Sequence, residues 1–142
     1  MSIKCIVIDL GGVYFSDGTK LAFSKILNTF NIKQNQVKNV FNLFSNSKKT
    51  IGRDIRLGRI SIDEFEKEFG EDLDIPEDKR YIIRHLWFSS YIPNYKMEVI
   101  VQQLRKKFRV IAFSGNIKER VEYLDERYDF LKYFDDTIFS YD

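Results

Sequence analysis

Cysteine, histidine and proline are scarce in this sequence, with one, one and two residues respectively among 142. The single thiol, Cys5, has no partner for an internal disulfide and does not indicate a cysteine metal cage. No apolar run approaches the ~20 residues that a membrane-spanning helix needs. Asp9 interrupts the first apolar run, which therefore lacks the pattern of a signal peptide. We expect a soluble, cytoplasmic protein with no membrane partner.

The net charge is also small, because 23 Lys and Arg residues stand against 21 Asp and Glu residues. Both signs are interspersed along the chain, which is not the pattern of a basic nucleic-acid-binding surface. Two short basic runs, Lys48-Lys49 and Arg105–Lys107, are typical of solvated helix surfaces. No strand interleaves aromatic with basic residues. We therefore expect no nucleic-acid partner.

Three short apolar runs predict β-strands. They are rich in β-branched residues and almost free of polar ones, which is typical of parallel strands buried on both faces. Helical periodicity precedes and follows the second run. In chain order, these strands and helices cover residues 3–8, 94–108, 110–113, 117–128 and 137–139. Their alternation predicts an α/β fold with a Rossmann-like parallel sheet.

The segment between the first two strands is much longer than a simple crossover needs. Its apolar residues recur at helical spacing, and Ser61 begins a capping box that predicts a helix ending at Gly70. A chain of this length can form one domain, or a compact core with one insertion. We predict an α/β core made of residues 1–14 and 94–142, with an inserted α-helical subdomain at residues 15–93.

Asp9 and Ser114 directly follow the first and second predicted strands. In an open α/β sheet, ligands bind beyond the carboxyl ends of the strands. Asp9 leads into Gly11-Gly12, a turn with no side chains to block approach and with free amides that can bind an anion. Ser114 supplies a hydroxyl donor, and Gly115 permits close approach of the backbone. These residues predict a site for phosphate.

The amides of Asn116 and Ile117 would open the helix that follows the second strand, and the positive end of that helix favours phosphate. The simpler alternative is that Asp9 only caps a turn and that Ser114 only caps the helix. Their matching positions at the ends of two strands favour a shared site, in which two loops hold one phosphoryl group.

The residues around both strand ends resemble two signatures of the haloacid dehalogenase-like (HAD) superfamily. Residues 6–13 (IVIDLGGV) resemble the first signature, and residues 110–114 (VIAFS) resemble the second. The insertion has the position and helical character of the superfamily's first type of cap. Residues 59–65 further resemble the cap of its sugar-phosphate and epoxide-hydrolase-linked phosphatase branch. The similarity spans the whole chain.

This resemblance implies a hydrolase, a phosphatase that acts on a small phosphorylated metabolite through an aspartyl-phosphate intermediate. Asp9 would be the catalytic nucleophile, and Mg²⁺ would be held by the Asp9 carboxylate and the Gly11 backbone carbonyl. The cap would select the substrate and shield the intermediate from water. The phosphate-binding residues would be Gly12, Ser114, Gly115 and Asn116.

The chain departs from the superfamily pattern at two points. Most of its phosphatases have a second aspartate, the general acid and base, where this chain has Gly11. Its absence predicts a slow enzyme, one that acts on good leaving groups, or one that borrows another proton donor. The third and fourth signatures, a lysine and an acidic pair, normally follow the segment that resembles residues 133–142, so we expect a chain truncated before them. Lys132 and Asp135-Asp136 are poor substitutes. The alternative function is a catalytically degenerate HAD-like fragment that acts as a binding or interaction module.

The first strand is expected to lie at an open edge of the sheet. In the HAD-like fold, the strand that bears the fourth signature would pair with the outer side of residues 3–8. Without it, an apolar strand has one neighbour and an unpaired edge, which favours pairing with another chain. We therefore predict self-association through the exposed edge of this strand. A phospho-accepting receiver domain also places an aspartate and a hydroxyl at strand ends, but the long helical insertion argues against that fold.

Trp87, Phe88 and Tyr91 form an aromatic cluster close to the point where the cap is expected to rejoin the core. One interpretation is that these side chains form the core of the cap. The other is that they form a wall that faces the substrate. The sequence leaves both interpretations open.

Overall fold

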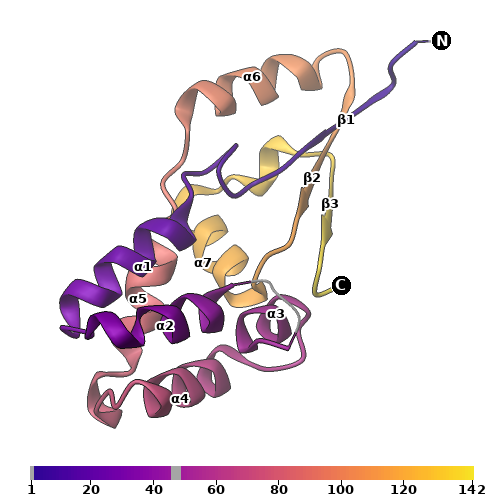
Figure 1. Cartoon of the computed structure of the whole chain (residues 1–142). Helices are drawn as coiled ribbons and strands as arrows, with labels where there is room; N and C mark the ends of the chain where they lie inside the picture. Colours follow the sequence, from indigo (N-terminus) through magenta and orange to yellow (C-terminus); the bar gives the residue numbers. More distant parts are fainter. Residues whose placement is uncertain (1, 46–48) are drawn as a thin grey trace.

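A computed structural model describes residues 2–45 and 49–142 of the chain. A small sheet with helices against it is joined to a group of helices that follows the first strand (Figure 1). The strands are β1 (Cys5–Ile8), β2 (Arg109–Ser114) and β3 (Asp136–Phe139). The helices are α1 (Gly18–Thr29), α2 (Val37–Phe44), α3 (Ile51–Arg56), α4 (Ile62–Asp72), α5 (Tyr81–Ser89), α6 (Tyr95–Arg105) and α7 (Lys118–Tyr128). Short 3-10 helices cover Gln34–Gln36, Glu77–Lys79 and Leu131–Tyr133.

The sheet confirms the predicted α/β fold. Its order is β1-β2-β3, and both neighbouring pairs are parallel. Ile8 is paired with Ala112, and Ser114 is paired with Phe139. In the described sheet, β1 has one hydrogen-bonded neighbour, as the sequence predicts. Because all three strands run in the same direction, their carboxyl ends meet at one edge of the sheet.

The two faces of the sheet differ in burial. On one face, Val110 and Ala112 are completely buried. On the other, Val7, Phe113 and Ile138 are 56%, 54% and 48% exposed, and we call these three side chains the apolar sheet face. The prediction that the strands are buried on both faces is therefore wrong. The chain moves along the sheet in one direction, from β1 to β2 to β3. Right-handed crossovers in one direction place their helices on the same face of a sheet. Accordingly, α6 and α7 lie on one side of the strands in Figure 1, and the other face stays exposed.

The helical segment from α1 to α5 has an aromatic interior. Phe44, Phe65 and Trp87 are at most 2% exposed, and the ring centroids of Phe44 and Trp87 are 4.5 Å apart. Phe88 and Tyr91 are also buried. Burial of such large rings contributes strongly to packing. Of the two interpretations of the Trp87 cluster, the structure therefore favours a core position for Trp87.

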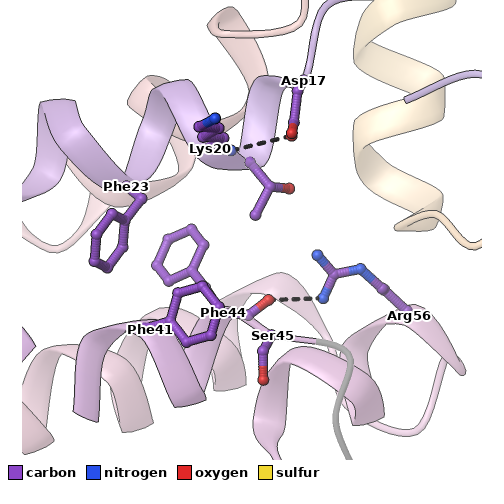
Figure 2. Close-up of a pocket in the computed structure, with 8 residues that line it drawn as sticks. Asp17, Lys20, Phe23, Phe41, Phe44, Ser45 and Arg56 are labelled. Atoms are coloured by element: carbon purple, nitrogen blue, oxygen red, sulfur yellow. Dashed lines mark hydrogen bonds between the residues drawn. The ribbon is translucent and has the colours of Figure 1, made fainter. Parts of the chain in front are cut away.

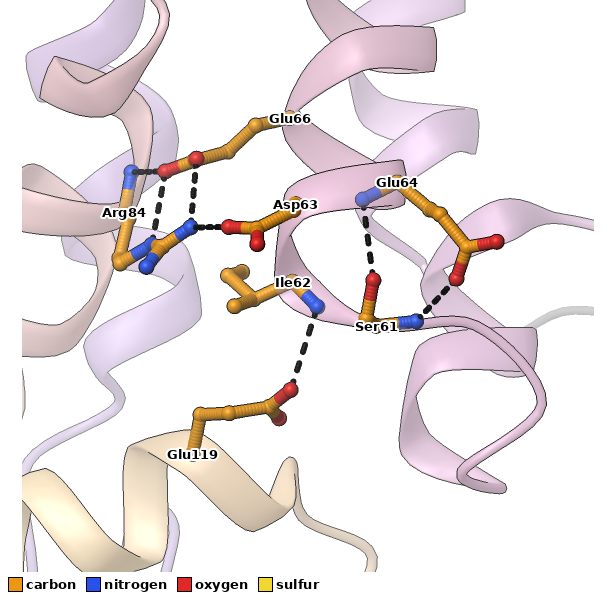
Figure 3. Close-up of polar contacts among 7 residues, drawn as sticks. All are labelled: Ser61, Ile62, Asp63, Glu64, Glu66, Arg84 and Glu119. Atoms are coloured by element: carbon orange, nitrogen blue, oxygen red, sulfur yellow. Dashed lines mark hydrogen bonds and ion pairs between the residues drawn. The ribbon is translucent and has the colours of Figure 1, made fainter.

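Helix α4 begins with the predicted capping box (Figure 3). Glu64 N donates to Ser61 Oγ at 3.2 Å, and Ser61 N donates to a Glu64 carboxylate oxygen at 2.7 Å. The predicted end of this helix at Gly70 is wrong, because α4 continues to Asp72. Gly70 is buried inside the helix, where a Cβ would lie 2.7 Å from the Arg80 side chain. The glycine therefore serves close packing and not termination.

Polar contacts join α4 to its neighbours (Figure 3). Arg84 of α5 donates to both carboxylate oxygens of Glu66, at 3.0 and 2.8 Å, and also pairs with Asp63. Burial raises the pKa of Glu66, although Arg84 opposes this shift. The first amide of α4, Ile62 N, donates to Glu119 of α7 at 3.3 Å. This bond ties the helical segment to a helix of the sheet layer.

The chain leaves the sheet and returns to it through two segments that lie side by side. Ser16 N donates to Ile92 O at 2.8 Å, and Ser16 Oγ donates to Ser90 O at 2.8 Å. Phe15 and Pro93 form an antiparallel bridge next to these bonds. The two segments therefore form one paired connection.

Of the two basic runs, Arg105–Lys107 is exposed at the end of α6, as predicted. Lys48 lies outside the described residues. Lys49 is exposed with a φ of 63°, so it does not lie on a helix surface. Within the described ranges, every helix is too short or too polar to cross a lipid bilayer.

Candidate active site

Asp9 lies one residue beyond β1, at the carboxyl edge of the sheet, and its side chain is exposed. Leu10 N donates to Asp9 Oδ1 at 2.7 Å, which fixes the carboxylate at the start of the turn. Phe15 N then donates to Leu10 O at 2.8 Å and closes the turn. Gly12 has a φ of 76°, a conformation that other residues rarely adopt. The glycine turn therefore leaves a single carboxylate open to a ligand.

Ser114 and Asn116 lie at the end of β2 and are almost completely buried. Asn116 Nδ2 donates to Ser114 Oγ at 3.4 Å. Asn116 Oδ1 accepts from Ile117 N at 2.9 Å and from Arg120 Nε at 2.8 Å. Gly115, between them, is exposed and has no atom within 4 Å of the position of a Cβ. The loop after β2 therefore combines an ordered hydroxyl with an open backbone.

The expected anion contacts from the amides of Asn116 and Ile117 are not available. Asn116 N donates to Ser140 Oγ at 3.1 Å, and Ile117 N donates to the Asn116 side chain. Gly12 N is also used, in a 3.3 Å bond to Ser16 O. Among the described hydrogen bonds, the amides of Gly11 and Gly115 have no acceptor. These two amides are therefore better placed for an anion than the pair predicted from the sequence.

Asp9 and Ser114 lie at the same edge of the sheet, because Ile8 and Ala112 are register partners. No hydrogen bond among the described residues joins the two side chains directly. A ligand bound between the two loops can be reached from both. The loops after β1 and β2 are therefore neighbours. Together they offer a ligand one carboxylate, one hydroxyl and backbone amides.

Comparison with known proteins gives a consistent picture. No protein-family model matches the chain. An uncharacterised curated protein of Dictyostelium discoideum is 27% identical over 150 residues, and the chain spans only 60% of that protein's length. The HAD-family enzyme BT-2542 from Bacteroides thetaiotaomicron, solved in complex with magnesium and inorganic phosphate, is 26% identical with a TM-score of 0.69. That match covers 99% of this chain and 70% of the solved chain.

The chain belongs to the HAD-like superfamily. A predicted HAD-like family hydrolase from Porphyromonas gingivalis has the same fold, with a TM-score of 0.65 at 19% identity. That match covers 99% of this chain and 67% of the solved one.

In this HAD-like chain, Tyr91 lies between the loop after β1 and the helical segment. A Cβ on Gly11 would lie 3.8 Å from the Tyr91 ring, and the ring packs directly on Gly18. Thr19 Oγ1 shares a 2.8 Å hydrogen bond with the Tyr91 hydroxyl and accepts from Trp87 Nε1 at 3.1 Å. This polar network gives Tyr91 a fixed position beside the candidate site.

Two buried arginines lie against the same aromatic group. Arg120 is 1% exposed, and its guanidinium carbon lies 4.2 Å from the Tyr91 ring centroid and 5.2 Å from that of Trp87. Arg56 is 7% exposed, 5.6 Å from the Trp87 centroid, and donates to Phe44 O at 3.0 Å. Burial lowers the pKa of Arg120. Burial, together with the charge of Arg120, lowers the pKa of Arg56 to about 10.

A cavity of about 490 Å³ lies between α1, α2 and α3 (Figure 2). The Arg56 guanidinium points into it, opposite the start of α1. Its lining is mostly apolar, with a few charged and hydroxyl groups. The lining residues are Asp17, Thr19, Lys20, Phe23, Phe41, Phe44, Ser45 and Arg56.

The HAD-like chain holds no ready-made metal cluster in its described part, where no three His, Cys, Asp or Glu side chains converge. Asp135 and Asp136 form ion pairs with Arg105 at 2.8 Å and with Arg109 at 2.9 Å. Lys132 pairs with a nearby aspartate at 2.6 Å. These residues lie at the start of β3 and before it, at the opposite end of the strand from Ser114 and its partner Phe139. They are therefore poor substitutes for the third and fourth signatures, as the sequence suggests.

The sequence did contain a signal for the buried arginine of α7. Ile117, Arg120, Val121 and Leu124 follow the i, i+3, i+4, i+7 spacing of a helix face that packs on a core. All four are buried. A charged residue in such a stripe therefore predicts a buried charge, and buried charges usually have a partner of opposite charge.

Proposed function

We propose that this HAD-like chain carries the nucleophile of a phosphatase that acts on a small phosphorylated metabolite. The supporting observation is that β1 and β2 end side by side, with Asp9 after one strand and Ser114 at the end of the other. Asp9 is exposed in a glycine turn, which leaves room for a phosphoryl group. The magnesium and phosphate complex of BT-2542 supports the same chemistry, since that enzyme matches this chain over 99% of its length.

The proposed reaction has two displacements at phosphorus. An Asp9 oxygen attacks phosphorus, the bond from phosphorus to the leaving oxygen breaks, and that oxygen keeps the electron pair. Water then attacks the aspartyl-phosphate, which releases inorganic phosphate and restores the carboxylate. Leu10 N orients one carboxylate oxygen at 2.7 Å and leaves the other for attack. Ser114 Oγ and the amides of Gly11 and Gly115 donate hydrogen bonds to the phosphoryl oxygens.

The residues present fit part of a magnesium shell. The Asp9 carboxylate is exposed, and none of the described hydrogen bonds of the turn uses the Gly11 carbonyl. Mg²⁺ commonly binds through one or two carboxylates while keeping waters and substrate phosphate oxygens. We infer that Asp9 and Gly11 hold the ion. When bound, the ion offsets the negative charge that gathers between the carboxylate and the phosphate.

Proton supply limits the proposed reaction. Gly11 occupies the position of the usual general acid, and general acid-base help is worth roughly 10²- to 10⁴-fold. Substrates whose leaving groups need no protonation are therefore favoured. The lack of a general acid at Gly11 supports the second candidate function. This function is a catalytically degenerate module that binds phosphate or a partner without turnover.

An aryl phosphate assay separates the two functions. With Mg²⁺ and p-nitrophenyl phosphate, the chain is expected to release p-nitrophenol slowly, and Asp9→Asn is expected to lower the rate to background. Asp72→Asn is a matched control, because Asp72 is an exposed aspartate at the end of α4. Equal turnover by wild type and Asp9→Asn would refute the role of Asp9. No turnover in either, with retained binding of inorganic phosphate, would support the degenerate module.

We further propose that residues 15–93 act as a cap over a core of residues 1–14 and 94–142, and that two copies of the chain associate. The open edge of β1 and the apolar sheet face support association, since they present unpaired backbone groups beside exposed apolar side chains. Pairing through β1 in two copies would extend the sheet across the interface.

A further inference from the structure

The buried guanidinium groups of Arg56 and Arg120 have no anionic partner in the described structure. None of its ion pairs involves either arginine. The undescribed positions, 1 and 46–48, hold Met, Asn, Ser and Lys, none of which is acidic. Buried cations are normally paired. The two arginines therefore form a positive site that lacks its counter-ion.

The nearby acids are engaged elsewhere. Asp17 Oδ1 accepts from Lys20 N at 3.2 Å and caps α1. Glu119, next to Arg120 in sequence, accepts from Ile62 N at 3.3 Å. Neither carboxylate reaches the arginines, so the anion has to come from outside the described chain.

Arg120 still has an unused donor. Its Nε donates to Asn116 Oδ1 at 2.8 Å, whereas Nη1 is fully buried without any partner. A buried donor without an acceptor is unfavourable unless a ligand satisfies it. The stacking on Tyr91 holds the guanidinium in place. Arg120 is thus a preformed donor that awaits an acceptor.

The same arginine is connected to the candidate phosphate site. Arg120 Nε bonds to Asn116, and Asn116 Nδ2 bonds in turn to Ser114 Oγ at 3.4 Å. Arg56 lines the cavity between α1, α2 and α3, and its guanidinium points into it (Figure 2). Both arginines contact Trp87, which places them around one aromatic ring. An anion bound by Arg120 would therefore be separated from Ser114 by the Asn116 side chain.

The cavity has the chemistry of a small amphipathic ligand. Phe23, Phe41 and Phe44 provide an apolar wall, while Thr19 and Arg56 provide polar contacts. A volume of about 490 Å³ is within the range of small-molecule sites. A ligand whose carbon skeleton contacts the phenylalanines and whose anionic group contacts Arg56 fits this lining.

We propose that Arg56 and Arg120 bind a second anionic group, a carboxylate or a second phosphate, of a phosphorylated metabolite whose first phosphate is bound at Ser114. This inference rests on the proposed phosphate site and adds a substrate class to it. The guanidinium fork matches either oxyanion in geometry. Substrates without a second anion leave the Arg120 donor buried and unsatisfied, so they bind more weakly.

Calorimetric titration without added metal tests this proposal with four probes, phosphoglycolate, ethyl phosphate, glycolate and inorganic phosphate. Phosphoglycolate and ethyl phosphate share a two-carbon skeleton and differ in the carboxylate. We expect phosphoglycolate to bind at least about tenfold more tightly than ethyl phosphate, as charge-assisted hydrogen bonds imply. Arg56→Met and Arg120→Met should each reduce this ratio toward one. Arg56→Met should also leave the affinity for inorganic phosphate unchanged, and this control is read in that variant because Arg120 bonds to Asn116 of the phosphate site.

Thermal unfolding without ligand separates a binding role from a structural one. Replacing a buried cation that lacks a counter-ion by a similar apolar side chain is expected to leave Tm equal or higher. If a Met variant fails to fold, Arg56→Lys and Arg120→Lys keep the charge and lose the planar fork, and a reduced preference for phosphoglycolate in these variants supports the proposal. An unchanged preference in the folded variants overturns it.

The outcomes for the two proposals are distinguishable. Equal binding of phosphoglycolate and ethyl phosphate, with inorganic phosphate binding lost in Ser114→Ala, overturns the second anion site and preserves the proposed function. Absence of inorganic phosphate binding, with glycolate binding that depends on Arg56 and Arg120, overturns the phosphate site and preserves the arginine site.

Discussion

Replacing Gly18 with alanine is expected to destabilise the protein, although alanine is normally the better helix residue. A Cβ built on Gly18 lies 2.1 Å from Cδ2 and 2.4 Å from Cε2 of the Tyr91 ring. Carbon atoms in contact are usually ~3.5–4.0 Å apart, so the ring has to move by about 1 Å or more. Arg120 stacks on the ring at 4.2 Å, and Thr19 holds its hydroxyl at 2.8 Å. The ring has little freedom to move.

The expected cost follows from two opposing effects. Overpacking of a well-packed site costs roughly 1–3 kcal/mol, and the helix preference of alanine over glycine returns at most ~1 kcal/mol. We therefore expect Gly18→Ala to lower the free energy of unfolding by about 1–2 kcal/mol. For a chain of this size, Tm should fall by roughly 3–8 °C.

Urea unfolding followed by circular dichroism measures this change, and a double-mutant cycle identifies its cause. In a Tyr91→Ala background the clash is gone, so Gly18→Ala should become neutral or stabilising. Gly115→Ala is the control, because a Cβ there meets no atom within 4 Å and its φ is not positive. Equal destabilisation by Gly18→Ala in both backgrounds, or none in the wild type, would refute the reasoning.

Two further predictions concern the sheet. The amide of Val110 and then Arg105 hold the pKa of Asp135 below its usual value. The stabilisation from Asp135 is therefore present above the ordinary carboxyl pKa of about 4 and lost as the pH falls through the lower folded pKa. Asp135→Asn should lose less stability than wild type when acid unfolding is followed from about pH 4 to pH 2. Self-association should appear as dimers in analytical ultracentrifugation at micromolar concentration, and Val7→Lys, a change at a 56% exposed side chain, should reduce it. A wild-type chain that sediments as a monomer would contradict the association.

The arrangement of strands and helices follows from local patterns in the sequence. The apolar runs that end at Asp9 and Ser114 form β1 and β2, and the capping box at Ser61 begins α4. These predictions succeed because side-chain periodicity and capping act over a few residues. The prediction for Gly70 is wrong because a glycine that ends a helix and one that admits a neighbouring side chain look the same in a sequence. The difference lies in Arg80, which only the tertiary structure places there.

The candidate site was predictable only in part, for a related reason. Asp9 and Ser114 are recognisable because strand ends are local features. The use of the Asn116 amide depends on Ser140, a residue 24 positions away that reaches it through the register of β3. The burial of Arg56 depends on how α3 packs, and a single arginine in a short helix carries no sign of it. The exposed side of Phe113 also escapes prediction, since an apolar strand has the same sequence pattern whether one face or both are covered.

The paired connection between the sheet and the helical segment has a consequence for how such a chain changes over time. Exit and re-entry occur at Ser16 and Ile92, whose backbones are joined by a 2.8 Å hydrogen bond. The chain therefore leaves the sheet and returns to it at one point. Helical inserts of other lengths can be exchanged at this point without displacing β1 or β2, because adjacent chain ends at a surface tolerate insertion. The helical segment can thus change in length and sequence while the strands of the sheet are retained.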